Sequence, residues 1–185
     1  MTTVQNAKFE FTGETKDHFG ITLHRIRAVA AIVALGVAVG DLGGWVEKED
    51  NLSVSGNAWV YGNARVYGDA SVSGDARVYG NARVYGDAWV CGDVWVCGDA
   101  WVYGSGLIFW ASKVGSENGT LTVYNTKDNT LEVTRGCFRG SVDEFLDASE
   151  KKHDDQTHLE YRLLIEVAYS RITRARDREP AQFKK

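Results

Sequence analysis

The feature that most constrains this chain is a run of hexads in which one aliphatic residue returns at every sixth position. Residues 54–107 read VSGNAW VYGNAR VYGDAS VSGDAR VYGNAR VYGDAW VCGDVW VCGDAW VYGSGL. Valine stands at positions 54, 60, 66, 72, 78, 84, 90, 96 and 102, and Ile108 keeps the register. An unbroken repeat of this kind predicts stacked copies of one small unit, each burying its apolar face against its neighbours.

Each hexad has the pattern of a short strand followed by a corner. In the stretch Ala-Arg-Val-Tyr, the alternation of a strand sends Ala and Val to one face and Arg and Tyr to the other. Gly-Asn or Gly-Asp then breaks the strand, because glycine adopts backbone conformations closed to other residues and Asn and Asp bond their own backbone. Three such sides are expected to close a triangular coil.

This pattern resembles the hexapeptide-repeat left-handed parallel β-helix, in which an aliphatic residue at every sixth position lines the interior. The resemblance covers residues 54–108, and the nine hexads would form three coils of 18 residues. At the usual strand spacing the stack would be only on the order of 15 Å tall, so both of its ends need caps. For this fold the resemblance also implies a homo-oligomer, with a trimer favoured.

The flanking segments are expected to supply those caps. Residues 1–53 should hold a hairpin, KFEFT and ITLHRIRA joined across GETKDHFG. Residues 109–175 should form a small β-β-α-α domain, with strands TLTVYNT and LEVTRGCF, a helix capped by Ser141 and Glu144, and a second helix starting at Thr157. Residues 176–185 are interpreted as a basic flexible tail. The predicted fold class is therefore mainly β, a short three-coil β-helix between an N-terminal β cap and a small α+β domain.

Segments outside the hexads carry a second resemblance. KFEFTGET, GITLHRIRA, GDLGGWVEKEDNLS, GNARVYGDA, VGSENGTLTVY, GCFRGSVDEF and EYRLLIEVA together resemble uncharacterised proteins of bacteriophages and prophages. The resemblance implies a phage gene product with a β-helix and transfers no site residue.

Composition narrows the function classes. Hydrophobic residues make up 44% and charged residues 25%, as in ordinary folded proteins, and the net charge of −4 argues against general nucleic-acid binding and against an anionic-membrane binder. The apolar stretch 28–39 is shorter than the roughly 20 residues that span a bilayer, and the start lacks a signal-peptide pattern. Three cysteines suit neither a disulfide scaffold nor a four-ligand zinc site. We therefore expect a cytoplasmic protein with reduced thiols, no metal and no cofactor.

One outer face of the predicted coils is a candidate binding surface. Stacking residues 18 apart places six aromatic and basic side chains on it, Arg65, Tyr67, Arg83, Tyr85, Trp101 and Tyr103. Trp59, Trp89, Trp95 and Trp101 are all expected to point outward, and a face so rich in Trp, Tyr and Arg has the composition of interface hot spots. One interpretation is structural, with cation–π and tyrosine ladders and a homo-oligomer contact. The other is the binding of a host protein or of a planar anionic ligand such as a nucleotide.

A second candidate lies at the turn GCFRG, which precedes the helix at Ser141. Backbone N–H groups at the start of a helix favour an anion, so Arg139, Gly140 and Ser141 form a possible anion site. Cys137 paired with His153 or His158 would give a nucleophile, while the structural alternative puts Cys137 and Phe138 in the core.

Catalysis inside the repeats is not expected. A hexapeptide-repeat acyltransferase, as that resemblance implies, needs a histidine base and an excursion loop, and the hexads contain neither. The predicted function is a non-enzymatic, phage-encoded binding protein that interferes with a host process such as antiviral defence, by binding a host protein or sequestering a nucleotide signal. The alternatives are a virion structural or assembly protein and an acyltransferase.

Overall fold

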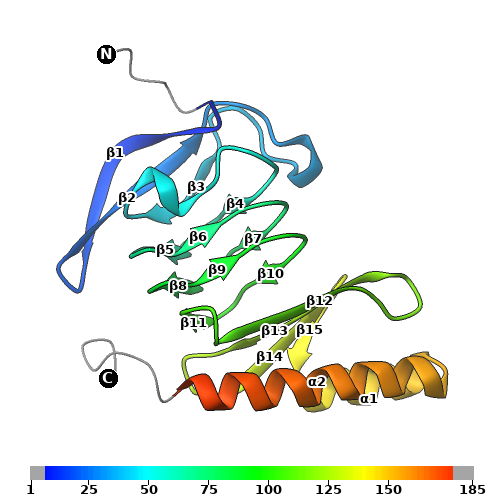
Figure 1. The fold of residues 1–185 in the computed structure, drawn as a ribbon. Helices are drawn as coiled ribbons and strands as arrows, with labels where there is room; N and C mark the ends of the chain where they lie inside the picture. Colours follow the sequence, from blue (N-terminus) through cyan, green and yellow to red (C-terminus); the bar gives the residue numbers. More distant parts are fainter. Residues whose placement is uncertain (1–6, 177–185) are drawn as a thin grey trace.

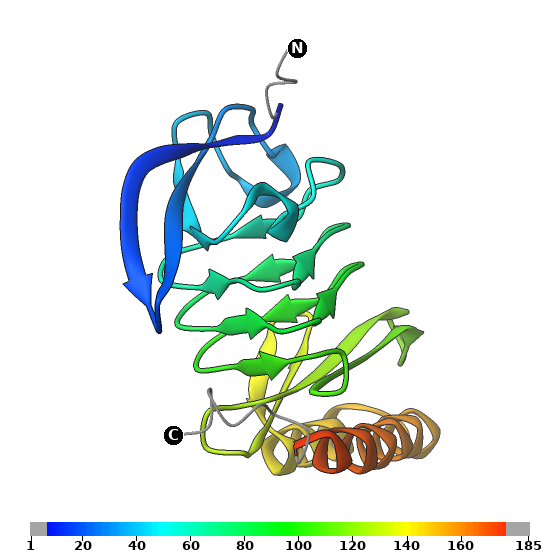
Figure 2. The same cartoon turned by 60° about the vertical axis from the view of Figure 1, so that its left-hand side comes forward.

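The computed structural model describes residues 7–176, which build three parts stacked along one axis (Figures 1 and 2). An N-terminal unit lies at one end, a three-coil β-solenoid lies in the middle, and an antiparallel sheet with two helices closes the other end. The predicted fold class, mainly β with a short solenoid, is confirmed.

The solenoid consists of short parallel strands, each of which spans the junction between one hexad and the next. They are β4 (Trp59–Val60), β5 (Arg65–Val66), β6 (Ser71–Val72), β7 (Arg77–Val78), β8 (Arg83–Tyr85), β9 (Trp89–Val90), β10 (Trp95–Val96) and β11 (Trp101–Tyr103). Each strand pairs in parallel with the strand 18 residues away, as Val66 does with Val84 and Val84 with Val102. The pairings define three faces, β5–β8–β11, β4–β7–β10 and β6–β9.

The interior of the solenoid is filled by the alanines and valines of the hexads. The valines from Val60 to Val102 are 0% exposed, and the alanines two positions before them are at most 1% exposed. At the corners, Gly74 has a φ of 68°, and a Cβ there would lie 2.7 Å from the backbone nitrogen of Gly92 in the next coil. Glycine is therefore needed at Gly74 both for the left-handed backbone and for the close approach of successive coils.

The N-terminal unit joins the solenoid through a shared sheet. Strands β1 (Phe9–His18) and β2 (Ile21–Ala28) form the predicted hairpin, but β1 continues through most of the segment expected to be a loop, with an irregular register between Phe11 and Thr15. After the short 3₁₀ turn η1 (Val33–Leu35), β3 (Leu42–Val46) pairs antiparallel with β2 and parallel with β5, and η2 (Glu49–Asn51) leads into the first coil. The hairpin is thereby held along one side of the solenoid (Figure 2).

The C-terminal part has four strands rather than the two predicted. Antiparallel strands β12 (Ile108–Val114), β13 (Gly119–Asn125), β14 (Leu131–Arg135) and β15 (Phe138–Ser141) form the sheet. Ile108 keeps the hexad register in sequence, yet it starts β12, because it pairs with Tyr124 of β13 and not with the preceding coil of the solenoid.

Two helices, α1 (Val142–Lys152) and α2 (Asp155–Arg176), pack on this sheet, and the predicted capping box of Ser141 and Glu144 is present. The second helix begins before the predicted Thr157, because the carboxylate of Asp154 accepts a hydrogen bond from the Thr157 N–H (2.7 Å). The predicted tail overlaps α2 at Arg176, and its remaining residues, 177–185, lie outside the described residues. Neither α1 nor α2 is long and apolar enough to cross a membrane.

Candidate functional site

Two side-chain ladders run across the outer surface of the β5–β8–β11 face. Trp45, Arg65, Arg83 and Trp101 follow one another in register, and the Arg83 guanidinium lies 5.2 Å from the centre of the Trp101 ring. Beside them, Tyr67 stacks on Tyr85 with ring centres 5.1 Å apart, and Tyr85 lies 5.4 Å from Tyr103. The predicted cation–π and tyrosine ladders are therefore present.

The tyrosine ladder is covered by the chain's own N-terminal hairpin. Tyr67 and Tyr85 are each 1% exposed and form a buried cluster with Leu23 and Trp45. His18, at the tip of the hairpin, meets the Tyr67 ring edge-on with centres 5.2 Å apart. Tyr67 and Tyr85 are thus core residues, because β3 extends the solenoid sheet and brings the hairpin over them. The alternating apolar residues Ile21 and Leu23 are the sequence signal that could have indicated that the hairpin packs over the tyrosine ladder.

The arginine ladder, in contrast, borders an open pocket of about 440 Å³. Its walls include Arg65, Arg83 and Trp101, three of the six residues predicted for this face. Asn81, Asp99, Ala100, Lys127 and Asp128 complete the lining. Asn81 and Asp99 are corner residues 18 positions apart, so their place beside the ladder could have been predicted from the repeat. Lys127 and Asp128 belong to the turn between β13 and β14, outside the repeat, so the sequence pattern gives no indication of their position.

Positive charge is concentrated along this ladder. Burial lowers the pKa of Arg65, and the neighbouring Arg83 lowers it further. Burial, followed by the charges of Arg65 and Arg25, lowers the pKa of Lys16 to about 8. For His18, burial is again the largest cause and the charges of Arg65 and Arg83 come next, so that its pKa falls to about 4. Burial is the largest cause of all three shifts, and the neighbouring cations add to each in the same direction.

Two polar atoms of the pocket walls also lack partners among residues 7–176. The Nε atom of Arg65 and the Nε1 atom of Trp101 are buried without a hydrogen bond. Lys127, on the opposite wall, is paired with Asp99 at 3.0 Å. One wall of the pocket therefore carries two arginines outside any ion pair of the described residues, and the other carries the Lys127–Asp99 pair with Asp128 beside it. The lining keeps a small excess of positive charge, which suits an anion.

The other outer faces of the solenoid differ in exposure. The Arg77 guanidinium lies 4.5 Å from the centre of the Trp95 ring on the β4–β7–β10 face. On the same face Trp59 is 0% exposed, packed in the core with Ile26 and other residues of the N-terminal unit, so its predicted exposure is wrong. Trp89, on the β6–β9 face, is 59% exposed as expected.

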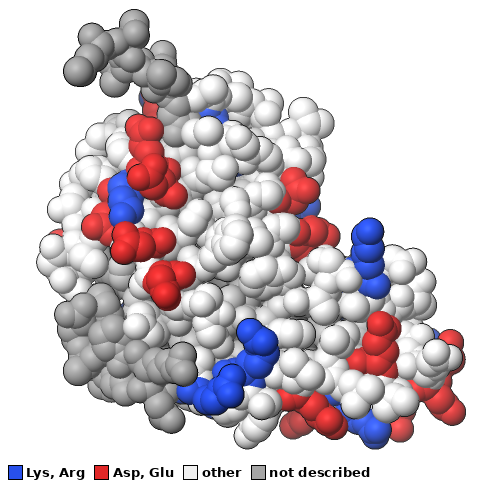
Figure 3. All heavy atoms as spheres, viewed as in Figure 1, with Lys and Arg blue, Asp and Glu red and all other residues white. Residues whose placement is uncertain are grey.

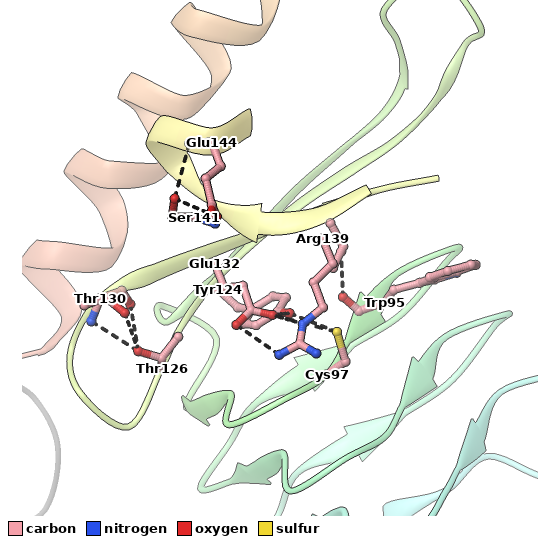
Figure 4. Close-up of polar contacts among 10 residues, drawn as sticks. Trp95, Cys97, Tyr124, Thr126, Thr130, Glu132, Arg139, Ser141 and Glu144 are labelled. Carbon is pink, nitrogen blue, oxygen red and sulfur yellow. Dashed lines mark hydrogen bonds and ion pairs between the residues drawn. The ribbon is translucent and has the colours of Figure 1, made fainter. Parts of the chain in front are cut away.

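The GCFRG segment joins the C-terminal sheet to the solenoid instead of leaving groups free for an anion (Figure 4). Arg139 forms an ion pair with Glu132, which also accepts a hydrogen bond from the Tyr124 hydroxyl (2.8 Å). The thiol of Cys97 lies 3.2 Å from the same hydroxyl.

At the start of α1, the Ser141 N–H donates to Glu144 (2.8 Å) and the Ser141 hydroxyl accepts from the Glu144 N–H. Gly140 lies directly before this cap and pairs with Val133 in the sheet. Arg139, Gly140 and Ser141 are thus engaged within the chain.

Cys137 is exposed, so the expectation that it belongs to the core is wrong, while Phe138 is half-buried. Cys137 and His153 line one hollow of about 120 Å³, yet the His153 ring is placed by Ser116, 3.3 Å from its Nδ1 atom. His158 lies against Ser149 in the same way, at 3.3 Å. Within residues 7–176 no hydrogen bond joins Cys137 to either histidine, and no group of His, Cys, Asp and Glu side chains is arranged to hold a metal ion.

Comparison with known proteins identifies the repeat. Residues 58–74 and 76–92 match the family model described as the YdcK beta solenoid repeat. The match lies wholly within the solenoid and agrees with the coils seen in the structure. No curated protein matches the chain.

Proposed function

We propose that this chain is a non-enzymatic binding protein that holds a planar anionic ligand, with a nucleotide as the first candidate, in the pocket beside Arg65, Arg83 and Trp101. One observation carries the proposal. The structure contains four ion pairs among its described residues, which engage Arg27, Lys48, Lys127 and Arg139, and neither Arg65 nor Arg83 takes part in any of them. Two adjacent guanidinium groups outside these ion pairs, at the wall of an open pocket, favour an anionic ligand, because Lys127 engages Asp99 and leaves Asp128 as the remaining acid of the lining.

The geometry suits a phosphate ester with a flat group attached. Guanidinium groups bind phosphate oxygens through paired N–H donors, and the half-buried side chains of Arg65 and Arg83 bring such groups to the pocket wall. The guanidinium planes and the indole of Trp101 provide surfaces on which a base can stack. A volume of about 440 Å³ also lies within the range of small-molecule sites.

The biological setting of this proposal comes from the sequence. Similarity to phage and prophage proteins supports a role during infection, in the host cytoplasm, as interference with a host process such as antiviral defence through sequestration of a nucleotide signal. Docking on a host protein through the same arginines is the competing proposal, and absence of nucleotide binding would favour it.

The test measures binding of defined nucleotides by calorimetry and by heat stabilisation. The probes are nucleoside mono- and diphosphates and cyclic dinucleotides, with inorganic phosphate to separate phosphate binding from base binding. A ligand at 100 times its dissociation constant should stabilise the fold by about 2.7 kcal/mol. The ligand should be recovered unchanged.

A matched pair of variants locates the site. The double change Arg65→Gln and Arg83→Gln should abolish binding, because it removes both uncompensated charges from the pocket wall. Arg77→Gln is the control, since Arg77 stands in the same kind of arginine–tryptophan ladder but on the β4–β7–β10 face. Binding that survives the double change, or absence of binding by every probe, would overturn the proposal.

A further inference from the structure

The outer surface of α2 carries an apolar stripe that no other part of residues 7–176 covers. Leu159, Leu163 and Val167 are 42%, 51% and 48% exposed. Spaced four residues apart, they lie on one line along the helix, opposite the buried stripe formed by Tyr161, Ile165, Ala168 and Ile172. A helix with apolar residues on both sides normally has a second partner.

Charged residues on this surface are segregated along the helix. Asp155 and Glu160 lie in its first part, and Glu166 lies beside the stripe at the middle. Arg171 and Arg174 lie in its last part, and the exception to the segregation is Arg162 in the first part. Figure 3 shows Lys and Arg side chains gathered over the C-terminal end of α2, with Asp and Glu side chains among those farther along the helix. Two copies of α2 packed in parallel would bring the arginines together, whereas antiparallel packing would place the acidic part of one helix against the basic part of the other.

We propose that α2 binds α2 of a second copy of this chain, antiparallel, about a two-fold axis between Ile165 and Glu166. Across such an axis, a residue of one helix lies level with the residue of the partner helix for which the two numbers add up to about 331. Leu163 therefore meets the partner helix near Val167, and the two apolar stripes face each other. In this register Glu160 faces Arg171 of the partner subunit, and the reciprocal pair forms at the other end.

The exposed aromatic side chain of α2 fits the same register. Tyr169 is 58% exposed and lies on the opposite flank of the stripe from Glu160 and Arg171, together with Arg162. Because 162 and 169 also add up to 331, the two-fold axis brings each Arg162 next to Tyr169 of the partner subunit, where a cation–π contact can form. One axis therefore brings together the apolar stripe, an ion pair and an aromatic contact, against the repulsion of the two Glu166 carboxylates that lie beside it.

Glu160 is already oriented for this role. One of its carboxylate oxygens accepts a hydrogen bond from the Gly115 N–H (2.8 Å), in the turn between β12 and β13. The carboxylate is thereby held through one oxygen and the other stays available, so that forming the pair with arginine costs less side-chain entropy.

The test measures the oligomeric state of the full chain by sedimentation equilibrium over a range of concentrations, with native mass spectrometry for stoichiometry. A dimer is expected. Leu163→Glu should abolish it by placing two carboxylates in the apolar stripe, while Trp89→Glu, an equally exposed apolar position on the β6–β9 face, should leave it intact. Circular dichroism of each variant checks that the fold is retained.

A charge exchange tests the direction of packing. Glu160→Arg alone and Arg171→Glu alone should each raise the dimer dissociation constant about tenfold, because each creates two like-charge contacts. The double change Glu160→Arg with Arg171→Glu should restore the association, since the antiparallel register then contains the same two pairs with their signs exchanged. A monomer at all concentrations, a trimer, a dimer that survives Leu163→Glu, or a double variant as weak as the single ones would each overturn the proposal.

Discussion

Replacing Tyr85 by alanine tests whether the hairpin really buries the tyrosine ladder. Tyr85 is 1% exposed and lies between Tyr67 and Tyr103, with ring centres 5.1 and 5.4 Å away. Loss of a fully buried aromatic ring costs about 3–5 kcal/mol, because the transfer free energy of the ring and the unfilled cavity both count. For a domain of this size the melting temperature should fall by about 6–20 °C.

The matched control is Trp89→Ala, which removes a larger ring from the equivalent class of outward hexad position. Because Trp89 is 59% exposed, its loss should change the free energy of unfolding by no more than about 0.5 kcal/mol. Urea unfolding followed by far-UV circular dichroism measures both variants without depending on tryptophan signals. Equal losses for the two variants, or a loss below about 1 kcal/mol for Tyr85→Ala, would refute the inference that the hairpin covers this face.

Further expected outcomes concern pH, thiols and caps. Burial and nearby cations lower the pKa of His18 from 6.5 to about 4 in the folded chain. Between these two pH values the unfolded chain binds a proton at His18 and the folded chain does not, so the free energy of unfolding should fall as the pH drops from 6.5 towards 4. The fall should be smaller in His18→Gln, measured by urea unfolding at each pH, and an identical pH profile would contradict it. Under native conditions iodoacetamide should modify the exposed Cys137 and leave the buried Cys97 intact until urea is added, as peptide mass spectrometry would show; early modification of Cys97 would contradict its burial. Ser141→Ala should cost about 1 kcal/mol by removing the cap of α1, and a Ser141→Asp variant should recover most of that loss in thermal unfolding.

The solenoid could be predicted in detail because its determinants are local. Whether Val84 points inward and Arg83 outward follows from the alternation of a strand, and Gly86 marks the next corner by its own backbone preference. The repeat then supplies the pairing, since every residue 18 positions on has the same environment. The same locality explains why the Ser141 and Glu144 cap was predictable.

The ends of the solenoid were harder to predict because their structure depends on strand pairing. Ile108 satisfies the hexad pattern, yet it pairs with Tyr124 on β13 and so belongs to the C-terminal sheet. Likewise, β1 extends through a segment that reads as a turn because β2 offers it a partner along its length. An edge strand pairs with whichever strand lies beside it in the folded molecule, and its own sequence does not indicate which strand that is.

The candidate site divides along the same line. Sequence alone determined that Arg65, Arg83 and Trp101 would form an outward ladder, because residues 18 apart must stack in such coils. Only the tertiary structure decided that Tyr67 and Tyr85 are buried, that Trp59 is core, and that the β13–β14 turn completes a pocket. The alternation of a strand determines, from a few neighbouring residues, whether a side chain points inward or outward. Whether an outward side chain is then buried depends on segments far away in the chain, whose position is set by the packing of the whole molecule.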